Sequence, residues 1–171
     1  MKSYTIALLS ALAGLGPLVS TGHAEILLAT GKTTPSVYGG ATYTIDFNDD
    51  APGGTVFNFT TTEAYTTVVV MFNAEAACGG DAFHWLDVDI LVNPAGAPGE
   101  TAIIPSNGDN AFCSGNDTDS NMLYGGDGWV SACTIGVILL RNAGTHTVRV
   151  RVDGAHCGIA RLDDMSLVVM K

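Results

Sequence analysis

The sequence predicts an all-β fold, a two-sheet β-sandwich of about eight antiparallel strands. Short runs of β-branched and aromatic residues alternate with clusters of Gly, Pro, Asn and Asp, which is the spacing of strands separated by turns. Helical periodicity is nearly absent after residue 24. Two of the runs also alternate between apolar and polar residues. Together these observations favour a sandwich or a barrel over a fold that contains helices.

The first 24 residues are predicted to be a signal peptide. Lys2 supplies a positive charge, an apolar segment covers residues 6–18, and Gly22-His23-Ala24 has the form of a cleavage site. The apolar segment is too short and too rich in glycine to span a membrane, so a retained anchor is the weaker alternative. We therefore expect a secreted protein, extracellular or periplasmic, in which residues 25–171 form a single domain.

Eight runs have the composition of strands, and a further strand at 25–30 is expected before them. The eight runs are 41–47, 55–61, 65–72, 85–92, 101–105, 129–140, 146–152 and 160–170. The longest irregular segment, 106–128, is rich in Gly, Asn, Asp and Ser. A loop of that length in a compact domain is either functional or a flexible connection.

The runs 85–92 and 146–152 each predict a strand with one face on the core and the other in water. In both, valine, leucine and isoleucine occupy every second position, and charged residues stand between them. The charged positions are Asp87 and Asp89 in the first run, and Arg149 and Arg151 in the second. We expect these four to be surface residues, paired across strands, and to contribute about 0.2–1 kcal/mol per pair.

The charge balance excludes several classes of partner. Seventeen acidic residues stand against seven basic ones, for a net charge of −10. Such a surface repels phosphate groups and anionic lipid, so nucleic acid is not expected as a partner. No second apolar segment is long enough for membrane insertion. Cations and neutral ligands remain as candidates.

Chain reversal at every turn would collect alternate loops at opposite ends of the sandwich. One end would then hold segments 48–54, 74–84, 106–128 and 153–159, which contain nine carboxylates and no Lys or Arg. The other end would hold 62–64, 93–100 and 141–145. This partition depends on the strand count, because one missed strand would change the side of every later loop.

Calcium is the sharpest hypothesis for the acidic end, because it takes six to eight oxygen ligands. The segment 116–121 contains the pattern D-x-D-x-N, but Met122 and Gly128 stand where an EF-hand needs Gly and Glu, so an EF-hand is excluded. The competing interpretation is a solvated loop in which Asp and Asn form turns. The candidate calcium ligands are Asp117, Asp119, Asn121, Asp109 and Asp127.

A sugar site is the second hypothesis for the same end. Flat aromatic rings stack on sugar faces while carboxylates accept hydrogen bonds from hydroxyl groups. The alternatives are tryptophans that plug the mouth of the sandwich and partly buried loop histidines, although two histidines and an Asp are also a weak zinc or copper signal. The candidate ligand-binding residues are Trp85, Trp129, Tyr124, His84, His156, Asp81 and Asp153.

The end of the chain resembles the closing strands of secreted jelly-roll modules. The resemblance rests on AGTHTVRVRV at 143–152 and LDDMSLVV at 162–169, which are similar to strands of carbohydrate-binding modules and of tumour-necrosis-factor-like or complement-type globular heads. A jelly roll packs two four-stranded sheets face to face. The resemblance implies that the seventh strand lies beside the fourth and the eighth beside the third.

Four cysteines follow the predicted signal peptide, and an even count in an exported protein indicates two disulfides. Composition alone leaves three connectivities open. The jelly-roll resemblance favours Cys78–Cys157 and Cys113–Cys133, because it places the eighth strand beside the third.

No enzyme signature is present: the sequence has no G-x-S-x-G, no H-E-x-x-H and no P-loop. The leading interpretation is a non-catalytic extracellular binding module that holds a glycan or another surface ligand, assisted by calcium. The alternative is a structural or assembly subunit of a surface, a matrix or an oligomeric head, which includes a homo-oligomer. A secreted hydrolase with two loop carboxylates is third. A binding module should show an aromatic-lined acidic pocket, whereas an assembly subunit should expose an apolar sheet face.

Overall fold

The computed structural model describes residues 24–47, 54–79, 84–103, 111–115, 129–154 and 159–171. These residues form strands and no helix, so none of them belongs to a helix that could cross a membrane. The strands are β1 (Ile26–Lys32), β2 (Ser36–Tyr38), β3 (Thr42–Thr44), β4 (Phe57–Thr61), β5 (Thr66–Gly79), β6 (His84–Asn93), β7 (Thr101–Ala102), β8 (Ala111–Gly115), β9 (Val130–Leu140), β10 (Gly144–Asp153) and β11 (Ile159–Met170).

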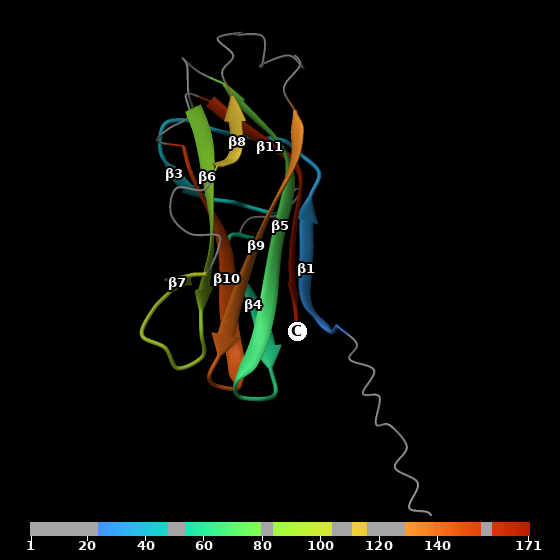
Figure 1. Cartoon of the computed structure of the whole chain (residues 1–171), viewed down its shortest axis with the longest axis vertical. Helices are drawn as coiled ribbons and strands as arrows, with labels where there is room; N and C mark the ends of the chain where they lie inside the picture. The colour runs from blue at the N-terminus through green and yellow to red at the C-terminus, as the bar shows by residue number, and fades with distance from the viewer. Residues whose placement is uncertain (1–23, 48–53, 80–83, 104–110, 116–128, 155–158) are drawn as a thin grey trace, which may run out of the picture.

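The strands form two antiparallel sheets that pack face to face (Figure 1). Sheet A has the order β1-β11-β5-β9, and β2 also pairs with β11. Sheet B has the order β3-β10-β6-β7, with β4 on β10 and β8 on β6. The predicted all-β sandwich is therefore confirmed.

Three sheet edges consist of two short strands in line along one neighbour. Strands β3 and β4 pair with successive parts of β10, β7 and β8 with successive parts of β6, and β1 and β2 with successive parts of β11. If each interrupted edge is counted as one crossing, each sheet has four strands. The seventh crossing, β10, lies beside the fourth, β6, and the eighth, β11, lies beside the third, β5. This is the jelly-roll order that the resemblance implied.

The two runs predicted as separate crossings at 41–47 and 55–61 belong to one crossing. The backbone N–H of Phe47 donates to the carbonyl of Gly54 at 3.2 Å, and the N–H of Gly54 donates to Asp46 Oδ1 at 3.2 Å. These bonds close the intervening segment and return the chain to β10 in the same direction. The expected strand at 25–30 corresponds to β1 and supplies the first crossing, so the total is still eight although 41–47 and 55–61 count as one.

Two consequences for the predicted partition of loops follow from this arrangement. The backbone N–H of Ile45 donates to the carbonyl of Val150, and Phe57 pairs with Val148, so these two flanking residues lie at the middle of β10 and not at the acidic end. In addition, β8 lies within the segment 106–128, which was predicted to be one loop. A bulge between Leu86 and Asp87 marks the irregular pairing of β6 with β8.

The other strand ends agree with the partition, except that β5 continues through residues 74–79, which were predicted to be loop, and so places Glu75 on a sheet face. At one end Gly79 pairs with Ile159 and His84 with Gly115, so these ends flank three of the acidic segments. At the opposite end the pairs are Thr61 with Gly144, Thr66 with Leu140 and Asn93 with Thr147. The connections that were predicted to share the second end therefore do so.

The core lies between the sheets and contains every second residue of the long strands. In β6 and β10 the predicted core-facing residues are confirmed, because Leu86, Val88, Ile90, Val148 and Val150 are fully buried. The expectation that Asp87 and Asp89 are surface residues is wrong, since they are only 6% and 7% exposed. The facing residues of β5 and β11 are buried equally well. Burial of one such side chain stabilises the fold by about 1.5–3 kcal/mol, so this interior holds the two sheets together.

A disulfide between Cys78 of β5 and Cys113 of β8 joins sheet A to sheet B. The predicted pairs Cys78–Cys157 and Cys113–Cys133 are therefore wrong. Cys78 and Cys113 are both buried, with Cα atoms 6.2 Å apart across the interior, whereas Cys133 is exposed on β9 and free. Cys157 lies outside the described residues. The prediction failed because it did not include β8, the strand that carries Cys113 into the core.

Candidate functional site

The outer face of sheet B carries a group of polar side chains and one tryptophan. The same alternation that buries Leu86, Val88 and Ile90 directs the intervening residues of β6 and β10 outward. We call this surface the polar face; its residues are Trp85, Asp87, Asp89, Arg149, Arg151 and Asp153, together with Thr44 of β3 and Glu100, which precedes β7.

Arg151 and Asp89 form the most buried ion pair of the polar face. The two residues are direct neighbours across β10 and β6, and both Nε, at 3.1 Å, and Nη2 of Arg151 donate to Asp89 Oδ2. The Asp89 side chain is 9% exposed, whereas the Arg151 side chain is 39% exposed. The buried acid therefore fixes the guanidinium group while leaving part of it open to solvent.

Arg149 is held from two sides. Its Nη2 donates to Glu100 Oε2 at 2.6 Å, and its Nη1 donates to Thr44 Oγ1 at 3.0 Å. Glu100 comes from the connection between β6 and β7, and Thr44 from β3 on the opposite side of β10. The Arg149 side chain remains 29% exposed. The sequence predicted that both arginines would pair with Asp87 and Asp89. The Arg151–Asp89 pair agrees with this prediction, whereas the ion-pair partner of Arg149 is Glu100.

Trp85 and Asp153 lie at the end of the polar face from which the acidic segments depart. Trp85 is partly exposed and pairs with Ser114 of β8, and Asp153 pairs with Asp87, two residues along β6 from the tryptophan. Two of the predicted ligand-binding residues are thus on one face. Trp129 is not with them, since it directly precedes β9 in sheet A.

Most of the other predicted site residues lie outside the part of the chain that the structure describes. For His84 only the backbone position, at the start of β6, is described. Among the described residues, no three His, Cys, Asp or Glu side chains are placed to hold a metal ion. The residues outside the described ranges are Tyr124, His156, Asp81, Asp117, Asp119, Asn121, Asp109 and Asp127.

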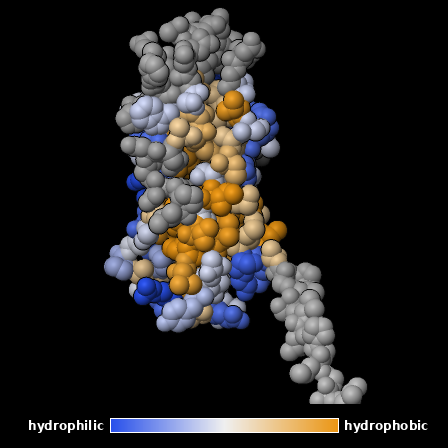
Figure 2. Space-filling model, in the orientation of Figure 1, coloured by the Kyte–Doolittle hydropathy of each residue, from blue (hydrophilic) through white to orange (hydrophobic). Residues whose placement is uncertain are grey.

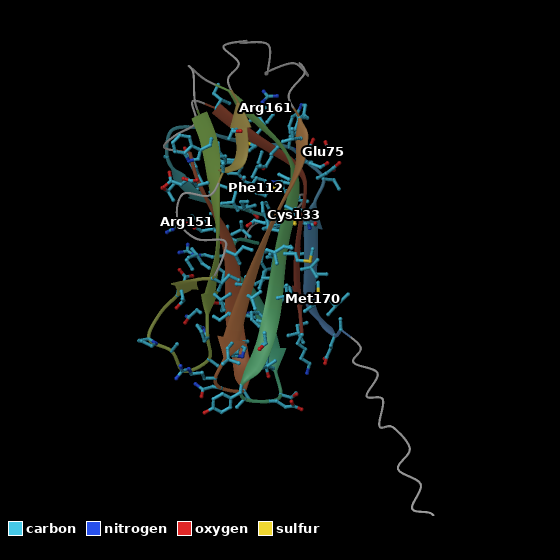
Figure 3. The ribbon with its side chains drawn as sticks, viewed as in Figure 1. Glu75, Phe112, Cys133, Arg151, Arg161 and Met170 are labelled. Carbon is cyan, nitrogen blue, oxygen red and sulfur yellow. A yellow bond between two sulfur atoms is a disulfide. The ribbon has the colours of Figure 1, made fainter. Side chains whose placement is uncertain are left out.

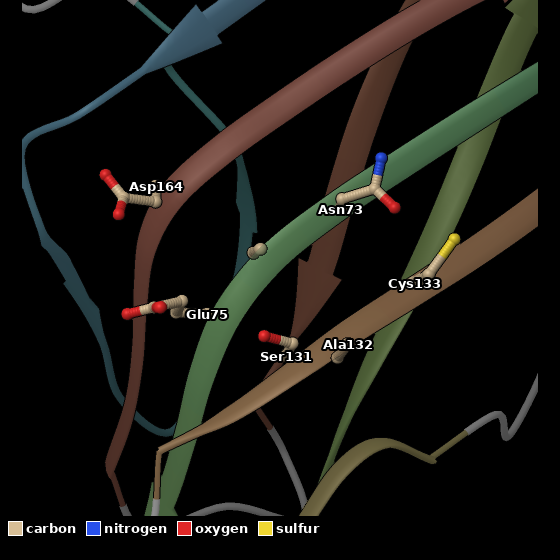
Figure 4. Close-up of a pocket in the computed structure, with 7 residues that line it drawn as sticks. Asn73, Glu75, Ser131, Ala132, Cys133 and Asp164 are labelled. Atoms are coloured by element: carbon tan, nitrogen blue, oxygen red, sulfur yellow. The ribbon is translucent and has the colours of Figure 1, made fainter.

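A depression of about 220 Å³ lies on the outer face of sheet A (Figure 4). It forms where β11 bulges between Asp163 and Ser166, and Asp164 there has a φ of 44°. Glu75 and Asp164 contribute carboxylates, and no aromatic side chain lines the depression. It therefore lacks the stacking surface that a sugar pocket needs. Its lining residues are Asn73, Ala74, Glu75, Ser131, Ala132, Cys133 and Asp164.

The middle of the outer surface of sheet A is apolar, and Figure 2 shows this surface over β5 and β9. Cross-strand pairing places Val69 beside Val137 and Met170, and Met71 beside Ile135 and Val168, so that two apolar rows cross three strands. Ile135, Val137 and Leu139 are 41%, 46% and 50% exposed. We call this surface the apolar face; it consists of Val69, Met71, Ile135, Val137, Leu139, Val168 and Met170.

The sequence did not identify the apolar face, although a signal was present. Residues 129–140 contain no charged side chain, so neither face of that run matches a water-exposed surface. Figure 3 shows how the two outer surfaces are separated: Arg151 lies on one side of the ribbon, and Cys133 and Glu75 lie on the other.

Comparison with known proteins gives little further information. No protein-family model matches the sequence, and no curated protein matches it either. One similar solved structure is the CBM22-1 xylan-binding domain of Xyn10C from Paenibacillus barcinonensis, with a TM-score of 0.38 and 16% sequence identity. The match covers 86% of this chain and 96% of that domain. The assignment of this chain to the β-sandwiches rests on its own strand pairing.

Proposed function

We propose that this chain is a non-catalytic extracellular binding module that holds a glycan on the polar face of sheet B. The observation that carries the proposal is the pair of guanidinium groups, Arg149 and Arg151, which acidic partners hold in place on the same outer face as a partly exposed tryptophan, Trp85, four residues along β6 from Asp89. Among the described residues, this is the surface that combines an aromatic ring with fixed hydrogen-bond donors.

The chemistry of the polar face suits a neutral ligand rich in hydroxyl groups. The indole ring of Trp85 offers an apolar plane on which the C–H groups of a sugar ring can stack. The planar guanidinium groups donate in fixed directions, and hydroxyl oxygens accept from them. Because Asp89 and Glu100 already restrict the arginine side chains, little additional rotamer entropy is lost when a ligand binds.

Calcium is proposed as a supporting ion, bound by the oxygen-rich ligands predicted in segments 106–110 and 116–128. Those ligands lie outside the described residues, so this part of the proposal rests on composition. Export is proposed on two grounds. One is the predicted signal peptide. The other is the Cys78–Cys113 disulfide, since such bonds form and persist in oxidising compartments.

A glycan array followed by calorimetry tests the proposal. We expect the parent protein to bind at least one glycan class, and we expect Trp85→Ala and Arg149→Ala each to weaken that binding tenfold or more. Glu75→Gln, on the outer face of the other sheet, is the matched control and should bind like the parent. Repeating the titration with EDTA tests calcium, which is rejected if affinity and melting temperature do not change.

Two results would overturn the proposal. One is a parent protein that binds no glycan in the presence of calcium. The other is parent-like binding by both the Trp85 and the Arg149 variants. Release of shortened sugars during the titration would instead favour the hydrolase interpretation.

A second function, assembly into a larger structure, is favoured by the apolar face of sheet A. Its exposed Ile135, Val137 and Leu139 are the kind of contiguous apolar surface that marks a protein contact. Assembly and glycan binding use opposite surfaces, so the two functions are compatible in one molecule.

A further inference from the structure

We infer that two copies of this chain associate edge to edge through β9, whose two copies pair antiparallel about a two-fold axis. The inference does not depend on glycan binding. It rests on a comparison of the four sheet edges, on the uncharged composition of β9 and on the ability of that strand to pair with its own copy.

Three of the four edges are interrupted, and β9 is not. The β1–β2 edge breaks after Lys32, the β3–β4 edge breaks after Thr44, and the β7–β8 edge breaks after Ala102. Short and broken edge strands are a common way in which proteins prevent unwanted strand pairing. Strand β9 is an uninterrupted edge of eleven residues, and within the described residues it pairs with β5 alone.

The composition of β9 also lacks the usual protection against pairing. The strand VSACTIGVILL contains no Lys, Arg, Asp, Glu or Pro. Ile135, Val137 and Leu139 are exposed on its outer face, and the inward-directed Ala132, Thr134 and Ile138 are only partly buried. A long, apolar and uncharged edge is the surface on which a further strand is expected to add.

A second copy of the chain fits this edge because β9 is complementary to itself: in the antiparallel direction, apolar residues of one copy meet apolar residues of the other. Each copy has a net charge of −10, and because β9 carries no acidic group, this edge lets two copies pair without setting carboxylates against each other. A two-fold axis perpendicular to the sheet makes the two strands antiparallel, which is the pairing already found throughout sheet A.

The register between the two β9 strands is set by pairing as many of their residues as possible. Pairing all eleven residues places Ile135 opposite its own copy, and it places Cys133 opposite Val137 of the second copy. The apolar rows then continue from one copy into the other. The axis also directs the polar faces of both copies to the same side of the dimer. On the proposed function, a polymeric glycan could then contact two sites at once and gain avidity.

Sedimentation analysis of the chain from Glu25 onward, under reducing conditions, tests the association. We expect a concentration-dependent species of twice the chain mass. Ile135→Lys should shift the protein to monomer, because the substitution places two positive charges opposite each other on the axis. Thr67→Lys, which adds the same charge on the same face but one strand away from the edge, should leave the dimer intact.

Cross-linking provides a readout that does not depend on whether the lysine variant folds. In a Cys133→Ser background, Ile135→Cys should form an intermolecular disulfide on mild oxidation, and Val137→Cys should not. With Cys133 retained, Val137→Cys should cross-link through Cys133 of the other copy. A parent that stays monomeric would overturn the inference. So would a dimer that resists Ile135→Lys and forms none of these cross-links, which would indicate stacking of apolar faces instead.

Discussion

The two sheets of this protein are alike on their inner faces and different on their outer faces. Inside, β5 and β11 of sheet A present the same fully buried aliphatic residues as β6 and β10 of sheet B. Outside, sheet B carries two ion pairs, Arg151–Asp89 and Arg149–Glu100, whereas sheet A carries exposed Ile135, Val137 and Leu139. The inner faces specify the fold, and the outer faces differ in their chemistry.

This contrast shows that an exposed position in a strand does not determine what kind of residue occupies it. Sheet B follows the usual rule of one apolar and one polar face, while sheet A is apolar on both faces over the middle of β5 and β9. An apolar face that stays in water lowers solubility without stabilising the monomer. Its presence in a strongly acidic chain supports the proposed contact with protein, whereas the chemistry of the polar face supports the proposed binding of a hydrophilic ligand.

The largest expected effect separates the inner from the outer face of one strand. Phe72→Ala should lower the free energy of unfolding by about 3–5 kcal/mol, because Phe72 is fully buried against Phe47 and Phe112 and a cavity would remain. Met71→Ala, at the next residue but on the apolar face, should cost less than about 1 kcal/mol. Urea unfolding of both variants measures the difference, and equal losses would contradict this account of sheet A.

A smaller effect separates the two ion pairs of the polar face. Asp89→Ala should cost about 1–2 kcal/mol, because a buried carboxylate that receives two N–H groups is lost while Arg151 can still turn to solvent. Glu100→Ala should cost only about 0.5 kcal/mol, since both partners of that pair are about one third exposed. Thermal unfolding at two salt concentrations checks this ranking: at high salt, Asp89→Ala should still lose more stability than Glu100→Ala. The comparison fails if Glu100→Ala is the more damaging variant.

The fold could be predicted because its signals are local and repeated. The alternation in 85–92 and 146–152 identified both central strands of sheet B and the face of each that packs on the core. What failed was non-local. Whether the chain reverses after Phe47 depends on hydrogen bonds among Phe47, Gly54 and Asp46, and no pattern of hydrophobicity records them.

The candidate site could be predicted only in part, for a related reason. Trp85 and Asp153 were identified as residues of one end, and both lie on the polar face. Glu100 was not identified, because its role depends on the path of the β6–β7 connection toward Arg149. The Cys78–Cys113 disulfide was missed because β8 is a short strand within a segment whose composition is typical of a loop.

The smallest expected effect on stability at neutral pH concerns His146, a histidine on the inner face of sheet B. His146 is fully buried between β4 and the β6–β7 connection, where it stacks on Phe59 with ring centroids 5.2 Å apart. Its Nδ1 accepts from the N–H of Ala95 at 2.9 Å, so the ring proton is on Nε2, 2.9 Å from Thr61 Oγ1. Burial lowers the pKa of His146 below its ordinary value of 6.5, because a charged ring would lose its hydration.

Since the folded state holds the neutral ring, the unfolded chain takes up a proton first as the pH falls. The contribution of His146 to stability should therefore be fully present above pH 6.5 and should decline as the pH falls from 6.5 toward the lowered pKa. His146→Gln should remove this part of the pH dependence even if it lowers stability at every pH. Unfolding curves of parent and variant between pH 5 and 8 provide the measurement. Parallel stability profiles across that range would show that the buried ring does not titrate as the structure requires.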